Sequence, residues 1–383
     1  MENPIFHWRL FAAAFLCCGL AAGIVIGWQH RTVDAPVPTL ASASNRLDSR
    51  SCAECHADIV DRFQRAPHRR TLRPATVPEL QALFANRELD SDLGRFQFFS
   101  DNQQLRLTTE RLPQAISVDW IFGSGQHALT PVAVWKNLAG QIESSQLHVS
   151  WYKGDRLGLT PGSEAADRDP ASLGIVHDPH QTADCFGCHA TYLPSDDGRI
   201  DLGQMVAGVS CARCHPGASQ HVASAGETAT LTDWPALSPL ESVRRCGECH
   251  RRDDQMTADE VTVEAADRLA RFASVGLVQS RCFTQQSVLS QSGARLDCIT
   301  CHDPHSPART DPAFYNKTCT ACHDPSHHPI AACNVMPNDS DCISCHMPKA
   351  STVQHLWFTD HWIRRPKANR SDHSTSPGPA QPQ

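Results

Sequence analysis

The spacing of the cysteines constrains this chain more than any other feature. Fourteen of its 18 cysteines fall into seven copies of Cys-x-x-Cys, and a histidine directly follows each copy. This five-residue pattern is the attachment signature of c-type haem, in which two thiols bond to the haem vinyl groups and the histidine ligates the iron. Zinc sites and disulfide frameworks also use closely spaced cysteines, but neither requires a histidine after every pair.

The sequence therefore predicts seven covalently bound haems c, each held by two cysteines and one proximal histidine. The attachment cysteines are Cys52, Cys55, Cys185, Cys188, Cys211, Cys214, Cys246, Cys249, Cys298, Cys301, Cys319, Cys322, Cys342 and Cys345, and the proximal iron ligands are His56, His189, His215, His250, His302, His323 and His346. Cys282 and Cys333 lie outside these motifs, and they either pair in a disulfide or remain separate thiols.

The N-terminal segment predicts attachment to a membrane. Residues Phe11–Trp28 form a run of 18 residues without a charged side chain, which is long enough to cross a bilayer as a helix. We expect residues 1–30 to be an uncleaved single-pass anchor in the cell membrane, with a cleaved signal peptide as the alternative. Haem c is attached outside the cytoplasm, so the haem domain is expected in the periplasm or another extracytoplasmic space.

The remainder of the chain predicts a mainly α, loop-rich multihaem cytochrome c fold with a small antiparallel β insertion, in addition to the one N-terminal transmembrane helix. Alternation of apolar and polar residues around Asp101-Asn102 indicates a hairpin, and Asn137–Gly140 indicates a second turn. The predicted divisions after the anchor are a flexible linker at 31–50, a first haem segment at 51–92, the β insertion at 93–160, a six-haem domain at 161–365 and a disordered tail at 366–383.

Each haem iron also needs a sixth ligand or an open position, and this choice decides what the protein can do. Fourteen of the 21 histidines lie outside the motifs. The candidate distal ligands are His68, His127, His180, His221, His305, His355 and His361. His177 is an alternative to His180, His327 and His328 compete for the same role, and His148 is expected to be structural because it lies in a predicted strand.

Several segments resemble a known family of multihaem cytochromes. They are Gly123-Ser-Gly-Gln-His127 before Ser150-Trp-Tyr152, Gly208-Val-Ser-Cys211 continuing to His221, Cys301-His-Asp-Pro-His305, Cys345-His-Met-Pro-Lys349 and Phe358-Thr-Asp-His361. As a set they are similar to the cytochromes related to the tetrahaem cytochrome of ammonia oxidisers, hydroxylamine oxidoreductase and pentahaem nitrite reductase. The resemblance implies a mostly helical fold with closely packed haem pairs. The Cys-x-x-Cys-Lys motif that the nitrite reductases use at their active site is absent from this sequence.

Two functions follow as alternatives. The first is electron transfer between redox partner proteins, such as a quinol oxidoreductase or another cytochrome, along a chain of six-coordinate haems. The second is an oxidoreductase that acts on nitrite, hydroxylamine or a similar small molecule at one open-site haem, so whether the chain is an enzyme stays open, with electron transfer favoured. The net charge of −7, without a basic stripe, does not favour binding of nucleic acid. The catalytic residues and the oligomeric state are not predicted.

The motif count makes a direct prediction about cofactor content. The fully matured chain should bind seven haems, one for each motif. The pyridine haemochrome assay against protein concentration measures this ratio, and the intact mass checks that the haems are covalently attached. A ratio well below seven in fully matured protein would contradict the assignment of the motifs.

Overall fold

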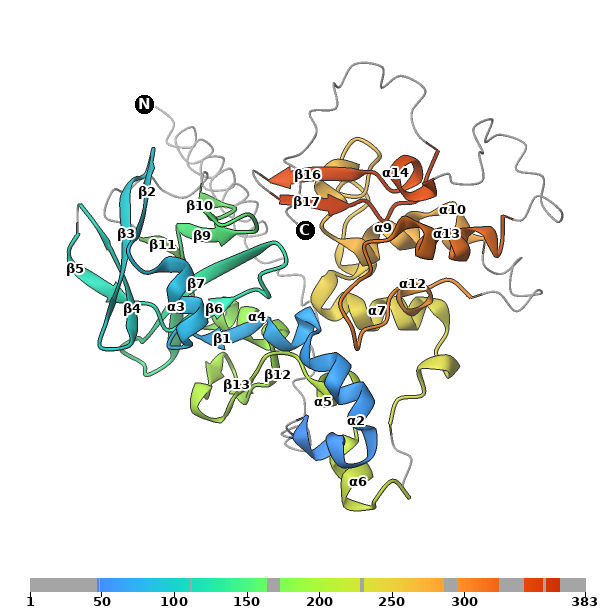
Figure 1. Ribbon diagram of the computed structural model, residues 1–383, viewed down its shortest axis with the longest axis horizontal. Coiled ribbons are helices and arrows are strands. Elements are labelled where there is room, and N and C mark those ends of the chain that lie inside the picture. Colours follow the sequence, from blue (N-terminus) through green and yellow to red (C-terminus); the bar gives the residue numbers. More distant parts are fainter. Residues whose placement is uncertain are drawn as a thin grey trace, which may run out of the picture. The chain divides into compact units, whose positions relative to one another are not determined.

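The computed structural model describes residues 47, 49–110, 112–163, 173–227, 231–285, 295–323, 341–353 and 356–365 (Figure 1). Several sequence predictions lie outside these residues. They are the membrane anchor at 1–30, most of the linker at 31–50, the tail at 366–383, the candidate ligand His355 and the possible disulfide partner Cys333.

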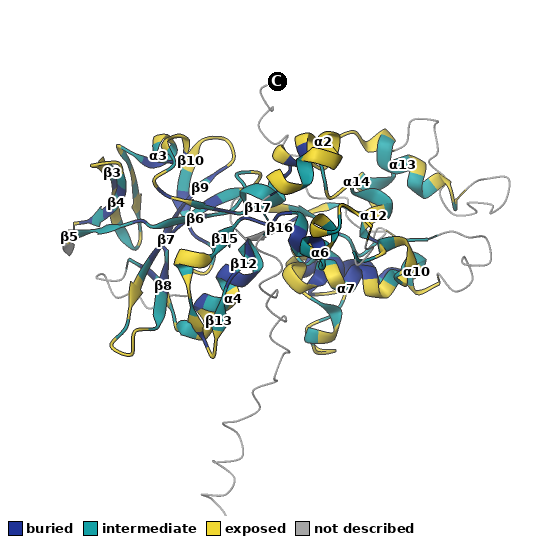
Figure 2. Cartoon of the chain, turned by 90° about the horizontal axis from the view of Figure 1, so that it is seen from below, coloured by how far each residue is buried: buried dark blue, intermediate teal, exposed yellow. Residues whose placement is uncertain are grey.

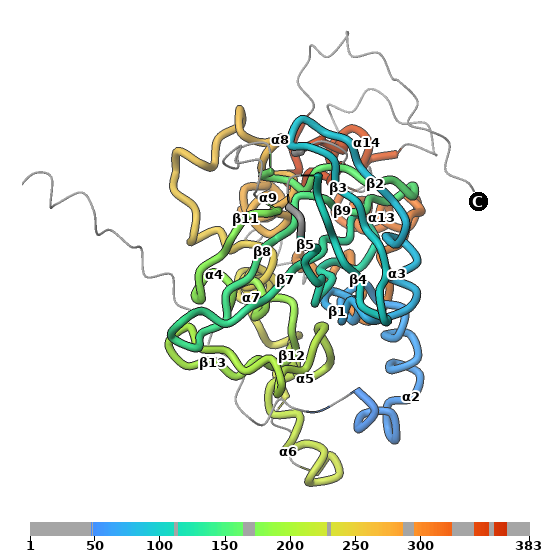
Figure 3. The backbone as a smooth tube through the Cα atoms, turned by 90° about the vertical axis from the view of Figure 1, so that its left-hand side faces the viewer, coloured from blue at the N-terminus to red at the C-terminus, as the bar shows by residue number. Residues whose placement is uncertain are grey.

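Antiparallel strands form two sheets in the N-terminal half of the described chain. The strands are β1 Leu72–Pro74, β2 Arg87–Ser91, β3 Gly94–Asp101, β4 Gln104–Thr109, β5 Leu112–Ser117, β6 Trp120–Phe122, β7 Ala128–Lys136, β8 Ile142–Leu147, β9 Val149–Tyr152, β10 Arg156–Leu159 and β11 Gly174–His177. A seven-stranded sheet has the order β1-β6-β7-β8-β11, with β9 pairing β7 and β10 (Figures 1 and 3). A second sheet has the order β2-β3-β4-β5.

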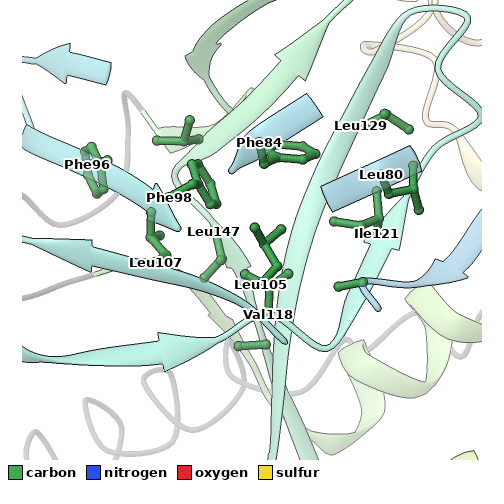
Figure 4. Close-up of a cluster of buried hydrophobic side chains, with 13 residues drawn as sticks. Leu80, Phe84, Phe96, Phe98, Leu105, Leu107, Val118, Ile121, Leu129 and Leu147 are labelled. Carbon is green, nitrogen blue, oxygen red and sulfur yellow. The ribbon is translucent and has the colours of Figure 1, made fainter. Parts of the chain in front are cut away.

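The two sheets and helix α3 (Pro78–Phe84) share one apolar core. Along β4 the exposure alternates strictly, and Leu105 and Leu107 are fully buried, as expected for a strand with one face toward a core. Phe84 and Phe98 are also fully buried, and their ring centroids lie 5.1 Å apart (Figure 4). This core gives the N-terminal half a rigid scaffold that is built from its own side chains.

The hairpin predicted around Asp101-Asn102 is confirmed. Strand β3 pairs with β4 in antiparallel register, with Asp101 opposite Gln104. Asn102 and Gln103 form the two-residue turn, and both have positive φ angles, of 50° and 65°. This backbone conformation is the one that a tight hairpin requires, and asparagine tolerates it better than most residues do.

Apart from α2, which precedes the sheets, the helices that carry the attachment motifs follow the sheets along the chain, and most of them are short. The helices are α2 Arg50–Gln64, α4 Pro179–His189, α5 Cys211–Cys214, α6 Ala218–Ala223, α7 Pro239–His250, α8 Ala266–Leu269, α9 Ala273–Gln279, α10 Arg281–Thr284, α12 Cys298–Cys301, α13 Pro312–Thr320 and α14 Cys342–His346, and the 3-10 turns are η2 Pro67–Arg70, η4 Leu202–Gln204, η5 Trp234–Ala236 and η6 Asp253–Gln255. Short two-stranded sheets accompany them: β12 Ala190–Tyr192 with β15 Val206–Ala207, β13 Ser195–Asp196 with β14 Arg199–Ile200, and β16 Lys349–Val353 with β17 Leu356–Thr359.

Local capping explains where several motif helices begin. Asp178, Ser238 and Asp297 each form a capping box at the start of α4, α7 and α12, which satisfies backbone N–H groups at the helix start. α4 and α7 each end on the histidine of their motif. α4 and α7 thus contain both cysteines and the histidine of a motif, whereas α12 contains two cysteines and is followed by His302 in an extended conformation.

The fold-class prediction was wrong in its mainly α character. Strands occupy most of residues 72–177, and the seven-stranded sheet recruits β1 and β11 from outside the predicted insertion at 93–160. The prediction failed because β1 and β11 are only three and four residues long, so their own sequences carry little strand signal. Their pairing with β6 and β8 is a tertiary effect.

The predicted transmembrane helix is not supported either. None of the helices in the described part of the chain combines the length and the apolar character needed to cross a bilayer.

The buried aromatic core predicts a specific stability effect. Replacing Phe98 by alanine should cost about 3–5 kcal/mol of stability, because it leaves a cavity beside Phe84. Urea denaturation followed by far-UV circular dichroism measures this loss. Leu138→Ala in the fully exposed β7–β8 turn is the matched control and should leave the curve unchanged. Equal curves for the wild-type protein and Phe98→Ala would contradict this account of the core.

Candidate haem sites

One large cavity connects residues of all seven attachment motifs. Its volume is about 3780 Å³, and its lining includes the histidine and at least one cysteine of every motif. Pockets for single drug-sized ligands are roughly 300–1,000 Å³. The helices α12, α13 and α14 at this cavity have no buried residues (Figure 2). The space therefore suits several large groups that pack against these helices.

Within the part of the chain that the structure describes, four of the seven motif histidines lie beside a second histidine from elsewhere in the chain. The ring pairs are His56 with His221 at 6.4 Å between centroids, His68 with His250 at 6.2 Å, His215 with His305 at 6.2 Å and His302 with His361 at 6.2 Å. In every pair one member belongs to a motif and the other is a candidate distal ligand. The structure thus brings together four pairs that the sequence could not match.

These separations fit two imidazoles that share one metal ion. A ligating nitrogen lies about 2 Å from a metal and roughly 1 Å from its own ring centre, so two rings on opposite sides should be about 6 Å apart. The observed distances of 6.2 to 6.4 Å agree with this expectation. Direct ring stacking would bring neighbouring rings closer, so the spacing suits pairs of rings that would each hold one iron.

Hydrogen bonds orient three of the histidine rings toward metal binding. The Nδ1 atoms of His189, His346 and His361 lie 2.9 Å from the backbone oxygens of Thr71, Arg364 and Thr359, respectively. A carbonyl oxygen can only accept, so each Nδ1 donates a proton and leaves Nε2 with its lone pair. A hydrogen bond of this kind fixes the tautomer and the ring orientation of a metal-ligating histidine.

Burial keeps several of these rings neutral. Desolvation lowers the pKa of His250 to about 4, with a smaller contribution from the neighbouring His68. Burial likewise lowers the pKa of His189, His302 and His361. Neutral imidazole is the form that binds a metal ion, so these four rings are in the ligating state at neutral pH.

The other candidate distal ligands have different surroundings. His127 lines the cavity, and its ring lies 5.1 Å from that of Phe358. Burial lowers its pKa, and the charges of Lys153 and Lys349 lower it further. His180 packs against the turn at Gly198 and is not among the residues that line the cavity. Ligand roles for both remain predictions.

His148 has the structural setting that the sequence suggested. Its buried Nδ1 lies 3.0 Å from the hydroxyl of Ser163, and its ring contacts Phe96 at 6.0 Å between centroids. Burial lowers its pKa, and the hydroxyl gives the neutral ring a hydrogen-bond partner. These contacts belong to the β scaffold.

Two features of the site had no signal in the sequence. The first is Thr71, whose carbonyl accepts from His189 Nδ1 while its hydroxyl donates to the His189 carbonyl at 3.1 Å. The second is contact between motifs: the sulfur of Cys188 lies 3.9 Å from the backbone oxygen of Glu248, inside the motif Cys246–His250. Both depend on residues far apart in the chain, so no local pattern could have shown them.

One family profile matches part of the chain. A sequence profile of the family "Cytochrome c554 and c-prime" matches residues 159–216, a segment that contains the motifs at Cys185 and Cys211. No curated protein matches the chain.

Two solved structures are similar to the chain at low sequence identity. One is the outer cell wall cytochrome OcwA, at 15% identity with a TM-score of 0.49, covering 84% of this chain and 80% of that one. The other is an undecahaem cytochrome from the S-layer of Carboxydothermus ferrireducens, at 13% identity with a TM-score of 0.43, covering 86% of this chain and 53% of that one.

The pair His56–His221 predicts a spectroscopic change. Replacing His221 by alanine should remove one axial ligand and convert the iron held by His56 from low-spin to high-spin. Electron paramagnetic resonance of the oxidised protein would show a new high-spin signal of about one-seventh of the iron, given one iron per motif. His148→Gln, which changes a histidine of the β scaffold, should add no such signal. A His221→Ala spectrum without high-spin iron would exclude this pairing.

Proposed function

We propose that this multihaem c-type cytochrome binds seven haems and transfers electrons along them in the extracytoplasmic space. The observation that carries the proposal is the set of four proximal–distal histidine pairs that line one shared cavity. When bound, the haems supply one-electron redox chemistry. The protein's own residues hold the irons, orient the ligands and set the distances between the haems.

Paired imidazoles suit electron transfer better than substrate chemistry. An iron with two histidine ligands stays six-coordinate in both oxidation states, so it changes charge with little rearrangement. At each of the four pairs the second imidazole would occupy the position that a small molecule needs. The backbone carbonyls at Thr71, Thr359 and Arg364 hold the Nδ1 protons in place, so the rings need not reorient during a redox cycle.

Contacts between the motifs support transfer from haem to haem. The sulfur of Cys188 lies 3.9 Å from the backbone oxygen of Glu248, inside the motif Cys246–His250. Both residues belong to attachment motifs, so the edges of these two haems are expected to be close. Electron tunnelling falls steeply with distance, and short edge-to-edge separations therefore favour fast transfer.

The cellular setting and the partners belong to the same proposal. Covalent haem attachment occurs outside the cytoplasm, which places the haem domain in the extracytoplasmic space. The electron donor and acceptor are proposed to be proteins, such as a quinol oxidoreductase or another cytochrome. We also propose that this chain is related to the hydroxylamine oxidoreductase and nitrite reductase group. The support is the similarity of the segments at 123–127, 150–152, 208–221, 301–305, 345–349 and 358–361.

The spin state of the iron tests this function. The full chain, matured in a host that exports it, should show only low-spin iron in the oxidised state, with an integrated spin that matches the haem count. This result would leave no open coordination site for a substrate. A high-spin fraction of about one-seventh of the iron, for seven motifs, would instead favour the small-molecule oxidoreductase, and nitrite and hydroxylamine should then be tested as ligands.

A further inference from the structure

The short segment Thr359–Arg364, which begins at the last residue of β17, contacts histidines of two different motifs (Figure 1). Within it, the ring of His361 lies 6.2 Å from that of His302, the histidine of the fifth motif. At its end, the backbone oxygen of Arg364 accepts a hydrogen bond from Nδ1 of His346, the histidine of the seventh motif, at 2.9 Å. Three residues of chain span at most about 11 Å, so one short stretch of backbone serves two ligand sites.

A buried carboxylate holds this segment together from within. Asp360 is only 2% exposed, and its Oδ2 forms an ion pair with Nη1 of Arg364. Its Oδ1 accepts a hydrogen bond from the backbone N–H of Trp362 at 2.9 Å. Nη1 of Arg364 also donates to the carbonyl of Trp362 at 2.9 Å. The ion pair therefore fixes the backbone that connects the ligand His361 to the carbonyl of Arg364.

The junction of α9 and α10 holds the same segment from outside. Ser280 is fully buried, and its hydroxyl donates to the carbonyl of His361 at 3.1 Å and accepts from the N–H of Ile363 at 2.8 Å. A Cβ atom at Gly276 in α9 would lie 2.8 Å from the backbone nitrogen of Trp362, so a larger residue would push the segment away. These contacts leave the segment little room to move.

The chain at the end of α14 joins the same network. The N–H of Asp360 donates to the carbonyl of Pro348 at 3.0 Å, and the N–H of Arg364 donates to the carbonyl of His346 at 3.4 Å. Together with the bond from Nδ1 of His346 to Arg364, three hydrogen bonds connect the segment to the seventh motif and the residues directly after it. A displacement of the segment would therefore also displace the hydrogen-bond partner of His346.

We propose that the Asp360–Arg364 ion pair is a positioning device that serves two haems at once. It holds His361 beside His302 at the fifth motif. It also holds the carbonyl of Arg364 that orients His346 at the seventh motif. Both members of the pair are positioning residues, because they act on the irons through these histidines. This inference rests on the proposed haem ligation and electron transfer.

Loss of the ion pair should act differently at the two haems. A hydrogen bond from Nδ1 to a carbonyl makes a ligating imidazole more basic, and a more basic ligand stabilises ferric iron. Withdrawal of the Arg364 carbonyl from His346 should therefore raise the reduction potential of the seventh-motif haem. Displacement of His361 should instead remove the sixth ligand of the fifth-motif haem and convert its iron from low-spin to high-spin.

The double variant Asp360→Ala/Arg364→Ala removes the pair without changing the net charge, because one acidic and one basic side chain are lost together. In the full, haem-loaded chain we expect a new high-spin signal of up to about one-seventh of the iron, given one iron per motif. We also expect the midpoint potential of a second haem to shift upward. Electron paramagnetic resonance and a redox titration followed by visible absorption measure the two effects.

Two further variants identify the signals. The matched control is Asp90→Ala/Arg95→Ala, which removes an exposed ion pair of the β scaffold and should change neither the spin state nor any midpoint potential. His361→Ala removes the sixth ligand directly, so it marks the high-spin signal of the fifth-motif haem, and the signal of the double variant should coincide with it.

The inference is overturned if the Asp360→Ala/Arg364→Ala protein keeps the wild-type spin state and potentials, if only one haem responds, or if the control responds equally. If this protein fails to mature, Asp360→Asn/Arg364→Gln takes its place, because it keeps side chains of similar size while removing both charges. The same two changes should then occur to a smaller extent, and their absence rejects the proposal. The haem count and spin state of the wild-type protein test the proposed function, whereas differences between variants and wild type test this inference.

Discussion

The pairing of one motif histidine with a second histidine from a distant segment is the interaction on which the rest of this structure depends. The pairs join residues 56 and 221, 68 and 250, 215 and 305, and 302 and 361. Each pair closes a long loop, and the helices involved are too short to form a conventional layered core. With haem iron between the rings, these pairs would act as crosslinks that hold the C-terminal half together.

The β scaffold contributes to the same interaction from outside the cavity. Strand β1 begins at Leu72, directly after η2, which contains His68, and pairs with β6. The backbone at Gly208 approaches the Arg69 carbonyl so closely that a Cβ atom there would lie 2.4 Å from its oxygen, and the neighbouring Val209 N–H donates to the His68 carbonyl. The backbone that carries the candidate ligand His68 is therefore held between the sheet and the third-motif segment, and only glycine at position 208 allows this close approach.

Burial controls the protonation of histidines at the cavity, whereas solvent screens the charged groups on the scaffold surface. Desolvation lowers the pKa of His250 and His189 and so keeps these two motif imidazoles neutral, which is the ligating form. Arg95 forms an exposed ion pair with Asp90 on the scaffold surface, where solvent screens its charge.

The sequence by itself determined the attachment cysteines and the proximal histidines as predictions, because each set is contained in five consecutive residues. It also determined the β3–β4 hairpin, whose turn at Asn102 and Gln103 is equally local. Only the tertiary structure decided which candidate distal histidine lies beside which motif histidine, because the two members of a pair are 59 to 182 residues apart in the chain. It also decided the extent of the sheets, because strands as short as β1 and β11 form only against partners that the fold supplies.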